Sequence, residues 1–414
     1  MHPARRLLPL IGLLLASLAV PGTATAARHH AAPAHHHAAP AKKAAAAPAG
    51  PPIIVDNPEL LVDMQTGNVL YADNAGAPWH PASLTKLMTA YVTFQAIADG
   101  RVTLDTRVVM SRKAVNEAPA RSGLPAGDSL SLKDALYVML VKSANDMAVA
   151  IAETVGGSTD AFAAEMNATA ARLGLTRTHY DNVNGLPDDG QVTTARDLAV
   201  LAIDLRRTFP QYDPIFRTQM VTIHNTNLRS SNELLSRFQG VTGMKTGYIC
   251  ASGLNVVATV ERNGRQLLAV VLGGDSARER DQLAAQLLTR GFAGELKDSG
   301  NSVVNIANDM SSPPMDMKPL LCGAKAKAYV TARLKQYPMG LRGAPNFLVP
   351  RFAGDVYAAT DLGPITGGPG TAVASTPDDS QPSQGDTNAT DEDPGPPDPT
   401  AGQAPVPAAR PQGR

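Results

Sequence analysis

The dipeptide Asn263-Gly264, placed between two apolar segments, is the feature that most constrains the fold. Both segments, residues 254–261 and 266–272, are rich in Val, Leu and Ala. Asn-Gly readily adopts the positive φ angles of a two-residue hairpin turn, and β-branched residues favour strands. A short apolar run without alternation is consistent with a strand buried on both faces. We therefore predict an antiparallel hairpin at the centre of a sheet.

Other segments predict further strands and a set of helices. Residues 59–64 and 68–73 read as two short strands around a turn at Gly67, where glycine suits a positive φ. Ser131 and Thr194 are candidate N-caps of helices. Helical spacing predicts helices at 131–142, 158–173, from 194 onwards and at 277–290. The expected fold class is α/β (α+β), with an antiparallel sheet flanked by helices and a mainly helical subdomain.

The N-terminus has the pattern of an export signal. Arg5 and Arg6 precede an apolar run at residues 7–20, and Ala24-Thr25-Ala26 has the small residues of a cleavage site. The alternative is a membrane anchor, which needs about 20 apolar residues. We therefore expect residues 1–26 to be a signal peptide that is removed during export.

Composition divides the rest of the chain. Residues 27–52 hold Ala, Pro and five histidines, which indicates a flexible linker, with a metal-binding tract as the alternative. A folded domain is expected at 53–295 and a poorly defined region at 296–355. A disordered tail rich in Pro, Gly, Asp and Thr is expected at 356–414.

Charge and cysteine content narrow the classes further. The formal net charge is zero and no block of like charges is present, so nothing favours nucleic-acid binding. Two cysteines, Cys250 and Cys322, are too few for a disulfide framework. They can form one bridge or stay reduced, and the sequence leaves both possibilities open.

Ser83 and Lys86 form the first candidate catalytic pair. Helical spacing of apolar residues predicts a helix after Pro81, and residues three apart on a helix share a face. Ser83 would lie in the first turn, where free N–H groups favour developing negative charge. A serine nucleophile needs a base within reach, and Lys86 can be that base if burial or a second cation keeps its amine neutral.

Taken alone, this pattern is far more often that of a surface helix turn. His80 is an alternative base, but no carboxylate partner for it is visible, so a structural or substrate-rim role is expected.

Two later motifs strengthen the catalytic interpretation. Ser143-Ala144-Asn145 falls in a break between two predicted helices, and Lys245-Thr246-Gly247 lies in a predicted strand. Taken alone, Ser143 would be a helix cap and Asn145 a turn residue. The order S-x-x-K, S-x-N and K-T-G at wide spacing matches the motif set of penicillin-binding proteins and serine β-lactamases. The chain thus resembles the low-molecular-mass penicillin-binding proteins that are serine-type D-alanyl-D-alanine carboxypeptidases.

The resemblance covers roughly residues 53–295 and implies a mechanism. Lys86 takes the proton of Ser83, which attacks the penultimate D-alanine carbonyl of a peptidoglycan stem peptide and forms an acyl-enzyme. Ser143 relays a proton to the leaving D-alanine, and Asn145 holds a substrate amide. Water then hydrolyses the acyl-enzyme. No metal and no organic cofactor is implied.

The resemblance also implies roles for the third motif. Lys245 would bind the terminal carboxylate of the substrate. Thr246 and Gly247 would let an extended peptide lie along the strand edge. The backbone N–H groups of Ser83 and Tyr248 would form the oxyanion hole, in which each donor is worth about 3 kcal/mol of barrier.

Two further segments are similar to the family. The loop at 181–186 contains Asn184-Gly185-Leu186, which is similar to an N-G-L segment of the carboxypeptidases. Arg280 corresponds to an arginine near the family's site, with Arg278 one small register shift away. For both arginines, the alternative is a solvated helix face.

The family context implies an exported enzyme of the bacterial periplasm or cell envelope. It would act in peptidoglycan biosynthesis, cell-wall biogenesis and cell shape, and β-lactam antibiotics would be its covalent inhibitors. Membrane association stays open, because no amphipathic C-terminal helix is readable.

Three alternatives stay open. They are a D-Ala-D-Ala endopeptidase of the same family, a serine β-lactamase and a non-catalytic wall-binding protein. The second motif is S-A-N and no Glu-x-x-x-Asn segment is convincing, which disfavours a β-lactamase. A wall-binding protein is expected to lose Ser83 or Lys86, and the chain keeps both.

Overall fold

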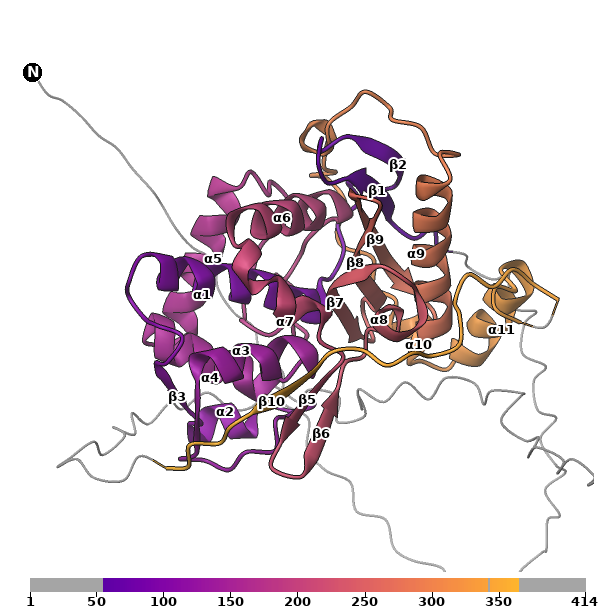
Figure 1. Cartoon of the computed structure of the whole chain (residues 1–414). Coiled ribbons are helices and arrows are strands. Elements are labelled where there is room, and N and C mark those ends of the chain that lie inside the picture. The colour runs from indigo at the N-terminus through magenta and orange to yellow at the C-terminus, as the bar shows by residue number, and fades with distance from the viewer. Residues whose placement is uncertain (1–54, 342, 365–414) are drawn as a thin grey trace, which may run out of the picture. The chain divides into compact units, whose positions relative to one another are not determined.

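A five-stranded antiparallel sheet contains the predicted hairpin (Figure 1). The computed structural model describes residues 55–341 and 343–364. Strand order is β2-β1-β9-β8-β7, and the strands are β1 (Glu59–Asp63), β2 (Val69–Asp73), β7 (Val241–Ile249), β8 (Gly253–Arg262) and β9 (Arg265–Gly274). Asn263 and Gly264 join β8 to β9 with φ angles of 50° and 76°. The hairpin prediction is confirmed, and β7 lies at one edge of the sheet.

The central strands are buried on both faces, and their side chains alternate between two clusters of apolar residues. On β9, Leu267, Ala269 and Val271 pack with helix α9 (Ala277–Phe292). The alternate residues Leu268, Val270 and Leu272 belong to the larger core that the sheet shares with the helical part. The sheet therefore has α9 on one face and the helical part on the other (Figure 1).

The helical part begins with the 3₁₀ turn η1 (Ala82–Thr85). It then comprises α1 (Lys86–Ala98), α2 (Arg112–Asn116), α3 (Leu132–Val141), α4 (Asn145–Gly156), α5 (Thr159–Arg172), α6 (Ala195–Thr208), η2 (Pro210–Tyr212) and α7 (Asp213–Arg217). The side chains of Ser131 and Thr194 accept N–H bonds at the starts of α3 and α6, as predicted. The helix expected after Pro81 opens as a 3₁₀ turn, so Ser83 precedes the α-helix that Lys86 begins.

Smaller elements complete the part before residue 296. Strands β3 (Arg107–Val109) and β4 (Ser129–Ser131) pair with each other, and α8 (Leu234–Arg237) precedes β7. Strands β5 (Met220–Ile223) and β6 (Thr226–Arg229) form an antiparallel pair.

The region after residue 296 packs along the preceding domain instead of forming a β-rich domain of its own within the described residues. It contains η3 (Val303–Asn305), α10 (Lys318–Leu321), α11 (Ala326–Gln336) and β10 (Val356–Ala359). β10 pairs in parallel with β5. The prediction that a disordered tail starts at residue 356 is therefore wrong at its first residues, because β10 forms there. The predicted signal peptide, the linker up to residue 52 and residues 365–414 lie outside the described residues.

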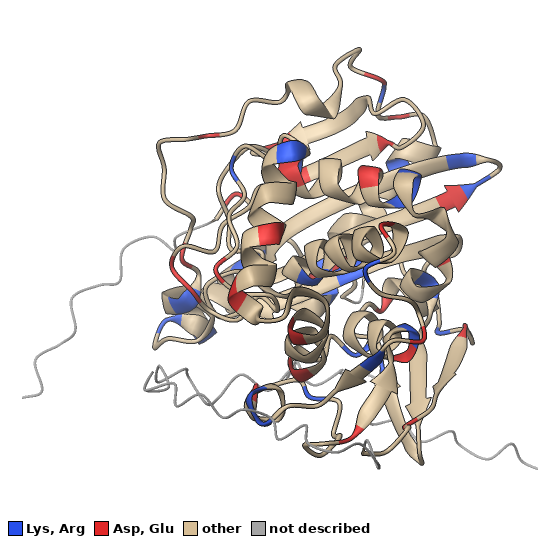
Figure 2. Ribbon diagram, turned by 90° about the vertical axis from the view of Figure 1, so that its left-hand side faces the viewer, with Lys and Arg blue, Asp and Glu red and all other residues tan. Residues whose placement is uncertain are grey.

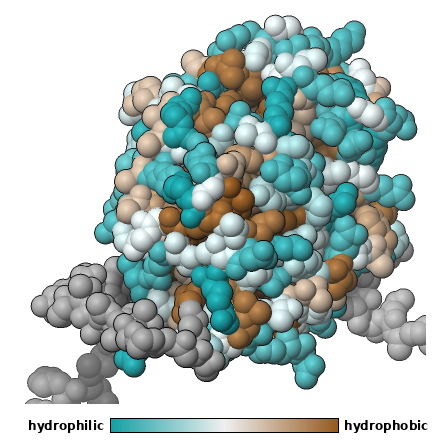
Figure 3. Space-filling view, turned by 60° about the vertical axis from the view of Figure 1, so that its left-hand side comes forward, coloured by the Kyte–Doolittle hydropathy of each residue, from teal (hydrophilic) through white to brown (hydrophobic). Residues whose placement is uncertain are grey.

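The surface is mixed in charge and hydropathy. Acidic and basic side chains are interspersed (Figure 2), and small apolar patches lie among hydrophilic residues on the face shown in Figure 3. Among the described residues, the large hydrophobic side chains that are exposed all lie in the C-terminal region, between Val304 and Leu362. Within residues 55–341 and 343–364, no helix has both the length and the apolar character needed to cross a membrane.

Candidate active site

Ser83 and Lys86 lie at the junction of η1 and α1. The Lys86 Nζ atom is 2.9 Å from Ser83 Oγ. Ser83 is partly exposed, whereas Lys86 is completely buried. The prediction that the two side chains meet therefore holds geometrically, with Ser83 partly exposed and Lys86 shielded from water.

The backbone around Ser83 is held in an uncommon conformation. Ala82 has a φ of 48°, in the left-handed region that non-glycine residues rarely adopt. Gly185 packs against this residue with a φ of 91°, and a Cβ there would lie 1.9 Å from the Ala82 carbonyl oxygen. Only glycine fits at position 185, so the N-G-L loop supports the turn that presents Ser83.

Lys86 has two further oxygen partners besides Ser83. Its Nζ is 2.6 Å from Asn145 Oδ1 and 2.7 Å from the Asn184 carbonyl oxygen. Both oxygens can only accept hydrogen bonds. In the structure Nζ donates to all three oxygens, as an ammonium does. After loss of one proton, the amine would keep two N–H donors for the Asn145 and Asn184 oxygens and turn its lone pair toward the Ser83 hydroxyl. This arrangement suits proton transfer from Ser83 to Lys86.

The second motif lies between α3 and α4, as predicted. Ser143 occupies the break with a φ of 67°, and Asn145 is the first residue of α4. The Asn145 side chain reaches Lys86, and its Nδ2 donates to the Pro119 carbonyl at 3.3 Å. The Ser143 hydroxyl accepts from Lys245 Nζ at 2.8 Å. The first and third motifs thus meet through the second.

The third motif lies on the edge strand β7. Lys245 is buried and also donates to the Thr246 carbonyl at 2.9 Å. Thr246 Oγ1 lies 2.6 Å from Ser231 Oγ. A Cβ at Gly247 would lie 3.0 Å from both Pro81 O and Ser83 N. Glycine therefore allows β7 to pack directly against the backbone of η1.

The last two predicted residues are Tyr248, within β7, and Arg280, in α9. Tyr248 is partly exposed, and its hydroxyl is 3.4 Å from Cys322 Sγ. Arg280 is buried in the first turns of α9, donates to Asp281 at 2.9 Å and to the Ser231 carbonyl at 3.3 Å. Because Ser231 in turn contacts Thr246, Arg280 is linked to the third motif through Ser231. The alternative of a solvated helix face is wrong for Arg280.

Two contributors were missed by the sequence analysis. Asn184 supplies a carbonyl to Lys86 while its side chain donates to Glu117 Oε1 at 2.7 Å. Ser231 links Arg280 to Thr246. The N-G-L pattern contained the signal for Asn184, but a backbone contact has no side-chain signature. Ser231 carries no signal in the sequence, because its partners are distant along the chain.

Burial controls the acidic groups near the site. Desolvation raises the pKa of Asp146, the second residue of α4, although its hydrogen bonds from Ser122 oppose that shift. Burial likewise raises the pKa of Asp281, against the opposing charge of Arg280. His80 is buried with Nδ1 3.2 Å from the Gln191 carbonyl, in agreement with the expected structural role. No cluster of three or more His, Cys, Asp or Glu side chains suited to a metal ion occurs among the described residues.

Comparison with curated proteins identifies several relatives. The chain is 36% identical over 248 residues to the D-alanyl-D-alanine carboxypeptidase DacD of Escherichia coli, covering 58% of this chain and 64% of the relative. It is 37% identical over 240 residues to DacC of the same organism, covering 56% of this chain and 60% of the relative. The chain thus spans less than two thirds of the length of these relatives.

Solved structures give the same fold. Penicillin-binding protein 6B of Escherichia coli matches with a TM-score of 0.55 and 36% identity, over 59% of this chain and 79% of that one. Penicillin-binding protein D2 of Listeria monocytogenes, in its cefotaxime-bound form, matches with a TM-score of 0.53 and 30% identity over 57% and 96%. The predicted penicillin-binding fold class is confirmed.

The family model described as D-alanyl-D-alanine carboxypeptidase matches residues 44–276, which is more than half of the chain. This match contains all three motifs whose side chains meet in the structure. The chain therefore belongs to peptidase family S11, the D-alanyl-D-alanine carboxypeptidases.

Proposed function

We propose that this protein is a serine D-Ala-D-Ala carboxypeptidase that removes the terminal D-alanine from peptidoglycan stem peptides. The observation that carries the proposal is the 2.9 Å contact between Ser83 Oγ and Lys86 Nζ, with the amine oriented by two obligate acceptors. Family membership and the names of the curated relatives support the same reaction.

Acylation begins when Ser83 attacks the carbonyl between the two D-alanine residues. Lys86 takes the hydroxyl proton, and the bond between Ser83 Oγ and the carbonyl carbon forms. The negative charge then develops on the carbonyl oxygen, close to where Gly247 packs against the Ser83 N–H. The backbone N–H groups of Ser83 and Tyr248 are the proposed donors to this oxygen, and each is worth about 3 kcal/mol of barrier.

Collapse of the intermediate requires a proton for the leaving amine. Ser143 Oγ accepts a hydrogen bond from Lys245, so its own O–H can donate to the leaving amine. The proton that Ser143 gives up is replaced by the one that Lys86 took from Ser83, which returns Lys86 to its neutral form. Lys245 supplies the cation for the carboxylate of the leaving D-alanine. Water then attacks the acyl-enzyme, and Lys86 is again the group within reach of Ser83 Oγ.

A β-lactam places a strained amide carbonyl at the same point, so we infer that these antibiotics acylate Ser83. The Listeria neighbour was solved in cefotaxime-bound and ampicillin-bound forms, which supports a shared site. The disulfide between Cys250 and Cys322 agrees with an exported protein, because such bonds persist in oxidising compartments. We propose the bacterial periplasm or cell envelope as its location.

Penicillin labelling tests this proposal. Mature protein and its Ser83→Ala variant are incubated with benzylpenicillin, digested and examined by mass spectrometry. We expect one adduct, on the peptide that contains Ser83, and no adduct in the variant. Penicillin that is rapidly hydrolysed without a lasting adduct would favour a β-lactamase. An adduct on any other residue would contradict the assigned nucleophile.

A further inference from the structure

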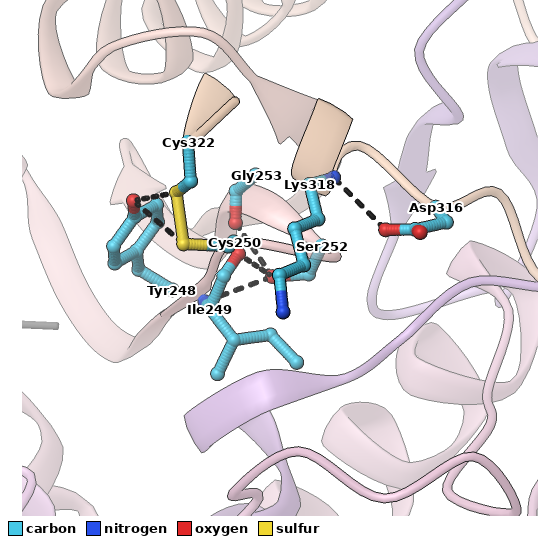
Figure 4. Close-up of a disulfide and its surroundings, with 8 residues drawn as sticks. All are labelled: Tyr248, Ile249, Cys250, Ser252, Gly253, Asp316, Lys318 and Cys322. Atoms are coloured by element: carbon cyan, nitrogen blue, oxygen red, sulfur yellow. Dashed lines mark hydrogen bonds between the residues drawn. A yellow bond between two sulfur atoms is a disulfide. The ribbon is translucent and has the colours of Figure 1, made fainter. Parts of the chain in front are cut away.

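A short C-terminal segment is attached to the turn that follows the third motif. We call residues 316–322 the bracket; it contains α10. Cys322 of the bracket is disulfide-bonded to Cys250, which directly follows β7, across 72 residues of sequence (Figure 4). The bracket therefore fixes the end of the strand that carries Lys245, Thr246 and Gly247.

The disulfide is reinforced by contacts on both sides of the turn between β7 and β8. Within the bracket, the Met317 N–H donates to the Ala251 carbonyl at 2.9 Å, and the Met317 side chain is completely buried. From the other side, Trp79 Nε1 donates to the Ser252 carbonyl at 2.8 Å. Trp79 lies four residues before Ser83. The turn is thus held between the bracket and the segment that leads to Ser83.

Tyr248 connects the disulfide to the reacting centre. Its hydroxyl lies 3.4 Å from Cys322 Sγ and 3.9 Å from Cys250 Sγ, and Figure 4 shows the ring beside the sulfur–sulfur bond. The preceding residue, Gly247, packs against the backbone nitrogen of Ser83. The disulfide is therefore two residues along β7 from Tyr248, one of the proposed oxyanion donors, and three from Gly247, which packs against the other donor.

We propose that the bracket and its disulfide are a positioning element for the oxyanion hole, and this inference rests on the proposed function. The intact bond holds the end of β7 so that the N–H groups of Tyr248 and Ser83 keep a fixed separation. Cys322 is exposed and Cys250 is partly exposed, so a thiol or phosphine reductant can reach the bond. The rate of acylation then depends on whether the two cysteines are oxidised.

The experiment compares the oxidised mature protein with the same protein reduced by a phosphine. One water supplies the oxygen and the two protons as the disulfide becomes two thiols and the phosphine becomes the phosphine oxide. Thiol titration confirms the reduction, and near-UV circular dichroism confirms that the protein stays folded. We expect kcat for a D-Ala-D-Ala peptide and the rate of penicillin acylation to fall about tenfold, with KM little changed, because the lost contacts act in the transition state. Reoxidation restores both rates.

Two variants serve as controls. A Cys250→Ala/Cys322→Ala variant is expected to show the low rate with and without reductant. Tyr357→Phe removes a hydrogen bond from β10 to Asp134, elsewhere in the C-terminal region, and is expected to leave the rate and its response to reductant unchanged.

Three results would count against these ideas in different ways. Equal kcat values for oxidised protein and protein with two titrated thiols would overturn the positioning role. A rate loss that follows the loss of the near-UV signal would also overturn it, because unfolding alone would explain the change. Failure of the oxidised protein to be acylated at all would instead contradict the proposed function.

Discussion

Replacing Asn145 by aspartate tests whether Lys86 acts as the base. The substitution keeps the shape of the side chain but places a negative charge at the atom that lies 2.6 Å from Lys86 Nζ. Both side chains are buried, at 4% and 0% exposure, so water screens the pair weakly. The added charge stabilises the ammonium form of Lys86, which cannot accept the Ser83 proton.

The expected size of the effect follows from this geometry. An opposite charge within hydrogen-bond distance of a titrating group shifts its protonation by about one to three pH units. On the acid limb, where most of the Lys86 amine is protonated, the neutral fraction therefore falls about 10-fold to 1,000-fold, which adds about 1.4 to 4 kcal/mol to the acylation barrier. Since the base acts above the pH at which it loses its proton, the acid limb of the rate profile moves to higher pH.

The assay is the rate of acylation by a fluorescent penicillin between pH 5 and 11, with Ser143→Ala as the matched control. Ser143 contacts Lys245 and lies outside the set of oxygens around Lys86 named above. Its loss should lower the rate without moving the acid limb. An Asn145→Asp profile that falls in height but keeps its acid limb in place would refute the assignment of Lys86 as base.

Three further predictions follow from individual contacts. Gly247→Ala should slow acylation about tenfold or more, because its Cβ would press on Pro81 O and Ser83 N at 3.0 Å; an unchanged rate would show that this close approach is unimportant. Arg280→Met should cost about 3–5 kcal/mol in the free energy of unfolding measured with urea, since it leaves the Asp281 charge buried and unpaired; a loss below about 1 kcal/mol would place the pair among ordinary surface ion pairs. Burial raises the pKa of Asp275 from 3.8 to about 8, so the folded state binds the extra proton and stability should fall as pH rises from about 4 towards 8; the urea midpoint of Asp275→Asn should lose part of this slope, and an identical slope would contradict it.

Local signals account for the parts of the fold that the sequence predicted. The Asn263-Gly264 turn, the caps Ser131 and Thr194, and the break at Ser143 all depend on interactions within a few residues. Each is confirmed in the structure. The relation of Ser83 to Lys86 was also local, being three residues along one turn.

The features that were missed depend on distant partners. The pairing of β10 with β5 joins residues more than 130 positions apart. It was not predicted, because the composition of residues 356–414 is typical of a disordered tail. The union of Cys250 with Cys322 could not be decided, because two cysteines are compatible with either redox state. Arg280 can be buried because Asp281 pairs with its charge and the Ser231 carbonyl accepts a hydrogen bond from its guanidinium. Ser231 is distant along the chain, so this contact could not be predicted from local sequence.

The most direct measurement of the central claim is D-alanine release from a peptide ending in D-Ala-D-Ala, with mature protein and Ser83→Ala assayed side by side. The Ser83–Lys86 contact predicts release by the mature protein and none by the variant. Release that persists in the variant would show that another group performs the reaction. No release by either protein would contradict the carboxypeptidase assignment.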